Sequence, residues 1–437
     1  MFNAMQLTTS FTGSRGVRYP APDVARGFML LFIAVANVPF WSKVPDESTG
    51  AFRASTADAW WVFVRTLFVD HRALPLFAML FGFGLMTMIN RRVASGTRAY
   101  LESLPGVEAG REPTPQEEAW ARGQATVDAR RLVRRRGWWM LLFGFVHGIF
   151  FMGDIIGAYG LIAVIYAGWL SRKRYTALYV VGAITALLAI GFVLVMGFIS
   201  SGAGGGGPAM PGVPWFVVNI IFWLSGLLFQ DFLTVIPLCA VIGARLADTD
   251  IITQPDRHRG LLVAAVGGGL ALAVVGALHL ALTSVMSISA WPWDIASKEL
   301  SGIAGACGWL ALLALYAGGP TPDGRLTGLR RLASAVGRRS MTVYLSQTIL
   351  FGTIFVIIPV LVTGERLWVG KAAAALIALG VWLVTVVLCT ALDRGGHAGP
   401  FETLLRTAVA CSERKRAIAP PPAVRLDDAR LEAALGG

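Results

Sequence analysis

The sequence predicts an all-α membrane protein, a polytopic bundle of about ten transmembrane helices. The chain has 437 residues, of which 55% are hydrophobic and only 15% are charged, and its mean hydropathy is +0.62. Soluble domains carry about 25% charged residues. Apolar runs of about 20 residues recur along the chain, and each is long enough to cross about 30 Å of hydrocarbon. The 50 glycines suit close contact between helices in lipid.

The expected organisation has three parts: a cytoplasmic segment 1–23, a helix bundle 24–392 and a cytoplasmic tail 393–437. No cleavable signal peptide is visible, so we expect the first span to act as an uncleaved anchor. The expected spans lie roughly at 24–40, 60–90, 137–152, 154–170, 175–199, 215–247, 260–285, 300–318, 340–362 and 370–392.

Basic residues are concentrated in every second loop between the expected spans, that is, in the loops on one side of the membrane. The loop at 91–136 holds ten Arg, 171–174 reads Ser-Arg-Lys-Arg, and the tail carries Arg414-Lys415-Arg416. The opposite loops hold only Lys43, Arg53, Lys298 and Arg366. This positive-inside pattern predicts that both termini are cytoplasmic. It also explains the net charge of +12 without a nucleic-acid partner. We expect a multi-pass protein of the plasma or inner membrane.

Two apolar segments are too long for one plain crossing. Asp70-His71-Arg72 interrupts the first, so we expect 58–69 to approach along the outer surface and 73–90 to cross. The second, 215–247, contains Gln230-Asp231 near its middle. Either a tilted helix or an interfacial half followed by a crossing half would fit it. Residues 202–214 predict an outer loop rich in Gly and Pro.

The loop at 91–136 predicts a polar helix. Thr114-Pro115-Gln116-Glu117 is a capping box with Pro at the first helical position, and the helix should run into the third span. Its basic run 130–136 has two interpretations. It is a topology signal beside anionic lipid, or it is a landing site for a phosphorylated cytoplasmic donor such as coenzyme A.

Polar clusters inside apolar segments indicate where function resides, because an ionisable side chain at a helix centre in lipid costs about 2.5–3.5 kcal/mol. Asp23 and Arg26 open the first span, and Asn37 lies about 16 Å further along the same helix face. A cap and a snorkelling Arg are the alternative interpretation. Asp70-His71-Arg72 predicts either the floor of an outer polar cavity or an interfacial cluster that faces water.

Two further clusters lie in the third and ninth spans. His147 is expected near mid-depth with Asp154 in the following turn, so His147 is either a structural histidine or a general base. Tyr344, Gln347 and Thr348 form one polar stripe behind Arg338, which predicts hydrogen bonding between helices or a site. No HExxH or CxxC motif suggests a metal, and the cysteines in apolar runs are expected to be inert.

In combination these motifs resemble one family. They are Asp-x2-Arg-Gly-x9-Asn, Leu-Phe-Ala-Met-Leu-Phe-Gly-Phe-Gly, His-x5-Gly-Asp-Ile, Gly-Arg-x-Ser-Met-Thr-x-Tyr-x2-Gln and Gly-Pro-Phe-Glu-x3-Arg. Residues 18–410 thereby resemble the YeiB-like membrane family, also called domain of unknown function family 418. That family has been grouped with transmembrane acyltransferases of the heparan-α-glucosaminide N-acetyltransferase and acyltransferase-3 types. These enzymes move an acyl group from cytoplasmic acyl-CoA to an acceptor on the far side.

The resemblance implies roles for particular residues. Arg26 matches the Arg that opens the first span in all three groups, and His147 with Asp154 matches the His…Gly-Asp motif. Asn37 stands where acyltransferase-3 proteins have a catalytic His. Because the heparan-type enzymes also have Asn there, the base must come from elsewhere. Asp70-His71-Arg72 departs from the usual Glu-Gly-Lys, and the candidate bases are therefore His147 and His71.

The sequence thus predicts a membrane acyltransferase with acyl-CoA, expected to be acetyl-CoA, as donor and no metal. His147, oriented by Asp154 or a neighbour, would deprotonate a hydroxyl or amine, and Asn37, Tyr344 or Gln347 would donate to the oxyanion. The predicted donor site comprises Asp23, Arg26, Arg72, Arg338, Tyr344 and Gln347. A transporter using the same polar residues is the competing hypothesis, and a non-catalytic membrane partner is the third. The acceptor and a homo-oligomer are left open.

Overall fold

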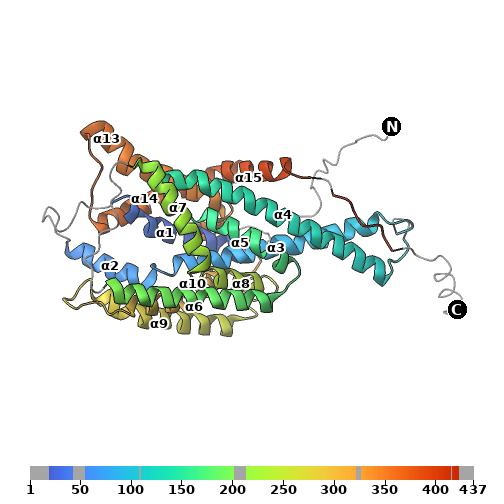
Figure 1. The fold of residues 1–437 in the computed structure, drawn as a ribbon, viewed down its shortest axis with the longest axis horizontal. Helices are drawn as coiled ribbons and strands as arrows, with labels where there is room; N and C mark the ends of the chain where they lie inside the picture. Colours follow the sequence, from blue (N-terminus) through green and yellow to red (C-terminus); the bar gives the residue numbers. More distant parts are fainter. Residues whose placement is uncertain are drawn as a thin grey trace.

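All regular structure in the described residues is helical, which confirms the predicted fold class. The structure, a computed structural model, describes residues 19–42, 55–107, 110–200, 213–320, 326–414 and 416–422. Figure 1 shows most of the long helices lying side by side along the longest axis of the molecule. The elements are α1 (Ala21–Asn37), η1 (Val38–Phe40), α2 (Thr56–Phe68), α3 (Ala73–Glu102), α4 (Pro115–Phe150), α5 (Ile156–Ser171), α6 (Tyr175–Ser200), α7 (Trp215–Phe232), α8 (Ile236–Leu246), α9 (Arg259–Leu282), α10 (Asp294–Ala317), α11 (Gly328–Gly337), α12 (Ser340–Gly352), the π-helix η3 (Thr353–Ile357), α13 (Ile358–Thr363), α14 (Lys371–Arg394) and α15 (Pro400–Cys411).

The helices have the length and apolarity of a multi-pass membrane protein. Within the described ranges, seven helical segments can cross a bilayer by length and composition: Ala21–Phe40, Thr56–Glu102, Tyr175–Met196, Arg259–Leu282, Asp294–Ala317, Ser340–Thr363 and Lys371–Arg394. Ile156–Ser171, Trp215–Phe229 and Ile236–Leu246 are shorter apolar helices. The count of ten spans and their orientation remain predictions.

Both long segments are broken, as the sequence suggested. The first divides into α2 and α3 at residues 69–72, where His71 adopts a left-handed φ of 58°. The second divides into α7 and α8, and Pro237 lies in the first turn of α8, where its missing N–H costs nothing. Residues 215–247 thus contain two helices rather than one, and the expectation of an interfacial half followed by a crossing half stays a prediction. The side chains of Gln230 and Asp231, and residues 202–212 of the expected outer loop, lie outside the described part of the structure.

The predicted polar helix forms the first half of α4. The hydroxyl of Thr114 accepts from the backbone N–H of Glu117, and the Glu117 carboxylate accepts from the N–H of Thr114, which confirms the capping box. Helix α4 then continues without a break to Phe150. Figure 1 shows the α3–α4 hairpin projecting from one end of the bundle. The segment after α15 runs along this hairpin, where Arg416 pairs with Asp128 at 2.7 Å.

Glycines bring the central helices together. A Cβ on Gly27 of α1 would lie 2.1 Å from the carbonyl oxygen of Ala333 in α11. A Cβ on Gly82 of α3 would lie 1.9 Å from the carbonyl oxygen of Ala240 in α8. Such backbone contacts supply the dispersion energy that holds helices together in lipid, where burial of apolar surface gives little. They give part of the high glycine content a role in packing.

Candidate functional site

A histidine, an aspartate and a threonine from distant parts of the chain meet inside the bundle. His147 lies in the last turn of α4, Asp154 in the turn before α5, and Thr348 in α12. The Nδ1 of His147 lies 2.7 Å from Oδ1 of Asp154, and its Nε2 lies 2.9 Å from the hydroxyl of Thr348. The side chain of His147 is 5% exposed and that of Asp154 is completely buried.

The surroundings of Asp154 fix the tautomer of His147. The Asp154 carboxylate accepts from the backbone N–H groups of Ile156 at 3.1 Å and Gly157 at 2.8 Å. It also accepts from Nε1–H of Trp223 at 3.2 Å. An ionised carboxylate only accepts hydrogen bonds, so Nδ1 of His147 carries the proton and donates. The lone pair of Nε2 therefore points at the Thr348 hydroxyl, which is the form that a general base requires.

Three glycines let the surrounding helices close on this pair. A Cβ on Gly144 would lie 2.3 Å from the backbone nitrogen of Gly157, and one on Gly148 would lie 2.3 Å from Cδ1 of Trp223. The α4–α5 turn is thus tight enough for the first N–H groups of α5 to reach Asp154. The positive end of that helix dipole also favours a negative charge there.

The polar stripe predicted on α12 is present, and two of its members reach His147. Thr348 bonds its Nε2, and the ring centroid of Tyr344 lies 5.2 Å from the imidazole centroid. The Tyr344 hydroxyl donates to the carbonyl of Gly153 at 3.3 Å. Gln347 instead points to α1, donating to the Leu30 carbonyl at 3.1 Å, while its buried Oε1 has no hydrogen-bond partner.

The predicted residues at the start of α1 form a group of their own. Arg26 pairs with Asp23 at 3.4 Å and donates to the Leu80 carbonyl at 3.2 Å. Arg136 lies within electrostatic reach of Arg26 and of Arg406. Sequence reasoning did not place Arg136 and Arg406 in one cluster with Arg26, because they come from three separate helices.

Arg338 and the final motif have structural partners. Arg338 forms an ion pair with Asp393 of α14, a residue that the sequence reasoning did not single out. Glu402 accepts from the backbone N–H groups of Met341 at 2.7 Å and Thr342 at 3.0 Å. It therefore caps the start of α12, the helix that carries Tyr344, Gln347 and Thr348.

The Asp70-His71-Arg72 turn forms a separate cluster. His71 pairs with Glu299 of α10, and Asp70 pairs with Arg65 at 3.1 Å. Arg72 is completely buried and donates to the Thr66 carbonyl at 3.1 Å. The polar partners of this cluster and those of His147 do not overlap among the described residues.

Asn37 ends α1 half-buried. Its side chain makes no hydrogen bond to another described residue. In the same ranges, no group of three His, Cys, Asp or Glu side chains is placed to hold a metal ion.

The sequence reasoning missed Trp223 and the role of Thr348. Thr348 was noted only as a member of the polar stripe, and Trp223 carried no signal beyond its place in an unusually long apolar segment. Their bonds to the His147–Asp154 pair join residues about 200 and 70 positions apart. No local periodicity reports such contacts.

Comparisons with known proteins agree with the predicted family. The model of the family described as "Protein of unknown function (DUF418)" matches residues 246–412. Residues 246–412 of this chain are therefore similar to that family. Over 421 residues the chain is 24% identical to the "Uncharacterized protein YxaH" of Bacillus subtilis (strain 168), covering 88% of this chain and 92% of that protein. No solved structure matches. The DUF418 match includes Arg338, Tyr344, Gln347 and Thr348, whereas His147 and Asp154 precede it.

Proposed function

We propose that the protein is a membrane acyltransferase that moves an acyl group, with acetyl as the expected one, from cytoplasmic acyl-CoA to a hydroxyl or amine of an extracytoplasmic acceptor. One observation carries the proposal. His147 has one ring nitrogen fixed by a buried carboxylate and the other directed at a hydroxyl. That is the arrangement in which imidazole acts as a general base for acyl transfer.

The chemistry follows from this geometry. Nε2 of His147 takes the proton of the acceptor hydroxyl or amine, whose oxygen or nitrogen attacks the thioester carbonyl. The C–S bond then breaks, and the imidazolium returns the proton to the departing thiolate. Asp154 stabilises the imidazolium. Thr348 is a positioning residue: its hydroxyl orients the imidazole through Nε2 until the hydroxyl or amine of the acyl acceptor takes its place. Tyr344, whose ring lies beside the imidazole, is the neighbouring donor for the oxyanion.

The donor would enter from the cytoplasmic end of α1. Arg26, Arg136 and Arg406 gather there, and arginine binds phosphate through paired, permanently charged donors. Arg136 and His147 lie on the same helix, about 16 Å apart by helical rise. This separation supports a donor whose phosphates stay at the inner surface while its thioester reaches the imidazole. Arg338 belongs to the same end of the bundle, although Asp393 shares its charge.

The test is CoA release by the purified full-length protein. Acetyl-CoA is supplied with membrane extract as the acceptor source, and free thiol is measured together with the affinity for CoA. Arg26→Ala should weaken CoA binding about tenfold or more, because a charge-assisted hydrogen bond contributes about 1.5–3 kcal/mol. His258→Ala, which alters only a surface pair with Asp250, is the matched control. Absence of both CoA binding and thiol release contradicts the proposal.

A transporter is the second candidate, and one observation favours it. Nε of the fully buried Arg72 and Oε1 of Gln347 have no hydrogen-bond partner among the described residues. Buried polar atoms of this kind also line the wetted paths of transporters. In reconstituted vesicles, substrate flux that needs no acyl-CoA and is lost in Gln347→Leu would favour transport over acyl transfer.

A further inference from the structure

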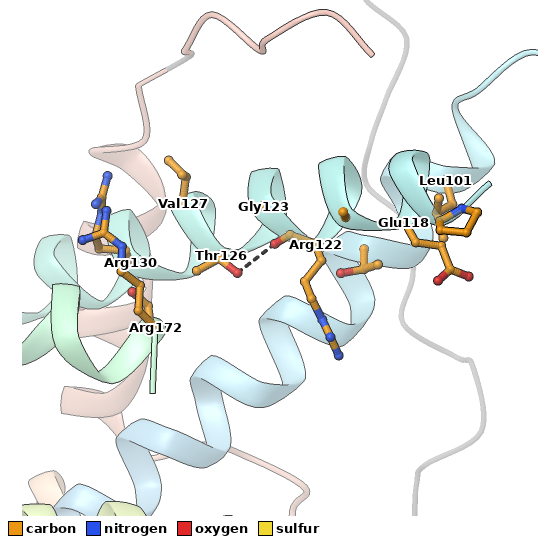
Figure 2. A pocket seen from close by; sticks show the side chains of 12 residues that line it. Leu101, Glu118, Arg122, Gly123, Thr126, Val127, Arg130 and Arg172 are labelled. Carbon is orange, nitrogen blue, oxygen red and sulfur yellow. Dashed lines mark hydrogen bonds between the residues drawn. The ribbon is translucent and has the colours of Figure 1, made fainter. Parts of the chain in front are cut away.

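A groove separate from the His147 cluster lies beside the α3–α4 hairpin. Its volume is about 780 Å³, and it is bordered by α3, the polar half of α4 and the end of α5. Figure 2 shows Arg130 and Arg172 at one end of the groove and Glu118 with Leu101 at the other. Its basic end therefore lies where α5 leaves the bundle, and its acidic end lies near the start of α4.

No carboxylate in the described part of the chain pairs with the positive charges of this groove. Arg122, Arg130 and Arg172 form no ion pair with any carboxylate that the structure describes. Two nearby cations do form ion pairs: Lys173 lies 2.9 Å from Asp248, and Arg416 lies 2.7 Å from Asp128. Partial burial and the charges of Arg172, Arg134 and Arg131 lower the pKa of Arg130. Bringing these like charges together costs free energy that an anion would offset.

A second, independent observation points to a ligand. The side-chain hydroxyl of Thr97, on the α3 wall of the groove, is buried and has no hydrogen-bond partner among the residues that the structure describes. On the α4 wall, by contrast, the hydroxyl of Thr126 donates a hydrogen bond to the carbonyl of Arg122 at 2.7 Å. A buried hydroxyl without a hydrogen-bond partner destabilises a fold by about 1–3 kcal/mol. An acceptor on a bound ligand would remove this cost at Thr97.

We propose that the basic end of this groove, Arg130 and Arg172, binds a phosphate group. Guanidinium groups match phosphate oxygens bidentately and stay charged, and Arg122 adds a third cation along the groove. The volume lies within the range of small-molecule sites, about 300–1,000 Å³. Glu118 repels an anion at the far end, so the ligand would lie with its phosphate toward Arg172. Two sources carry such a group: a soluble phosphorylated ligand and the headgroup of an anionic lipid.

This site does not depend on the proposed acyl transfer. Arg130 lies on α4 about 25 Å from His147 by helical rise, so His147→Ala should leave binding in the groove unchanged. If acyl transfer fails and phosphate binding persists, only the proposed function is lost. If the groove fails and CoA still binds in an Arg26-dependent way, only the present inference is lost.

The experiment uses the full-length protein in phosphatidylcholine nanodiscs. The soluble arm measures the affinity for CoA, with pantetheine as the phosphate-free probe. The lipid arm measures by native mass spectrometry how much phosphatidic acid is retained relative to phosphatidylcholine. The test variant is Arg130→Gln with Arg172→Gln. Its matched control is Arg131→Gln with Arg134→Gln, which removes the same charge from exposed positions on α4 that do not line the groove.

We expect the test variant to lose about tenfold or more in affinity or retention in one arm and the control to change less than about threefold. The arm that responds identifies the source of the phosphate. Thr97→Val should weaken the same binding about threefold without lowering the melting temperature, because its hydroxyl has no partner to lose. Equal loss in test and control variants would reveal only a basic surface and overturn the proposal. Absence of a response in both arms would overturn it as well.

Discussion

His147 and His71 are both paired with a carboxylate in this apolar chain, yet their settings differ. The ring of His147 is hydrogen-bonded at both nitrogens, and its partners come from the α4–α5 turn and from α12. His71 has Glu299 as partner, its side chain is 33% exposed, and it occupies a turn with left-handed backbone. A histidine acts as a base when its tautomer and direction are fixed. The comparison therefore supports His147 over His71 as the proposed base, in line with the preference drawn from the sequence.

The largest expected difference between variants of the two histidines is in acyl-transfer activity. His147→Ala should lower acyl transfer by a factor of about 10²–10⁴, the usual contribution of a general base. His71→Ala should reduce it modestly, mainly through KM, because His71 shares no polar partner with His147 and is predicted to lie toward the outer face. Rates of CoA release on folded proteins measure both. An inactive His71→Ala beside an active His147→Ala would reverse the assignment.

Removing one carboxylate at a time sharpens the comparison. Asp154→Asn places an amide NH2 among the donors of Ile156, Gly157 and Trp223, so we expect a loss of stability of about 1–3 kcal/mol and a strong loss of activity. Glu299→Gln should cost less than about 1 kcal/mol, because the pair is partly exposed. Denaturation midpoints and CoA release separate the two. Similar losses in both variants would contradict the proposed difference.

Glycine substitutions test the packing around each histidine. A Cβ on Gly144 would approach Gly157 to 2.3 Å, and one on Gly302 would approach the carbonyl oxygen of His71 to 2.1 Å. Both Ala variants should lose about 1–3 kcal/mol of stability, but only Gly144→Ala should also lower the activity per folded molecule. Gly191→Ala is the control, because a Cβ there has nothing within 4 Å. Normal turnover in a folded Gly144→Ala would show that this contact does not position Asp154.

Thr348 provides a smaller test on the His147 side. Thr348→Val removes the hydroxyl at Nε2 and should lower turnover about tenfold or less, consistent with one neutral hydrogen bond. The loss should appear in kcat rather than in KM, because the hydroxyl orients the imidazole. Thr348→Ser keeps the hydroxyl and should restore kcat. A valine variant with unchanged kcat would assign Thr348 to packing alone.

The smallest effect concerns a group outside both clusters. The Arg111 guanidinium, with further help from Thr114, lowers the pKa of Glu117 to about 2. A carboxyl group whose pKa is lower in the folded than in the unfolded protein stabilises the fold fully when the pH is above the unfolded-state pKa. This stabilisation is lost as the pH falls through the folded-state pKa of about 2. Glu117 therefore contributes no change between pH 5 and 8. Glu117→Gln should leave the activity profile unchanged there and remove part of the acid-dependent stability of the hairpin, as followed by helix content. A changed profile would implicate the hairpin in catalysis.

Local patterns predicted the elements well. The break at residues 69–72 followed from three consecutive ionisable residues, and the start of α4 followed from its capping box. Proximity in sequence also paired His147 with Asp154, since seven residues separate them across one turn. The pairing of Arg338 with Asp393 could not be predicted in this way, because they lie 55 residues apart. The different polar partners of His71 and His147 could not be predicted either, because these partners come from other helices.

The sequence by itself determined the membrane-length apolar helices, the breaks in two of them and the polar residues that interrupt them. These features depend on hydrophobicity and on backbone preferences that act within a few residues. Only the tertiary structure decided which polar groups meet. It brought Thr348 and Trp223 to the His147–Asp154 pair, and it left Arg130 and Arg172 without an ion pair to any carboxylate in the described ranges. Hydrogen bonds and ion pairs act over about 3 Å, so their partners are set by how helices pack, and here glycine contacts between helix backbones set that packing.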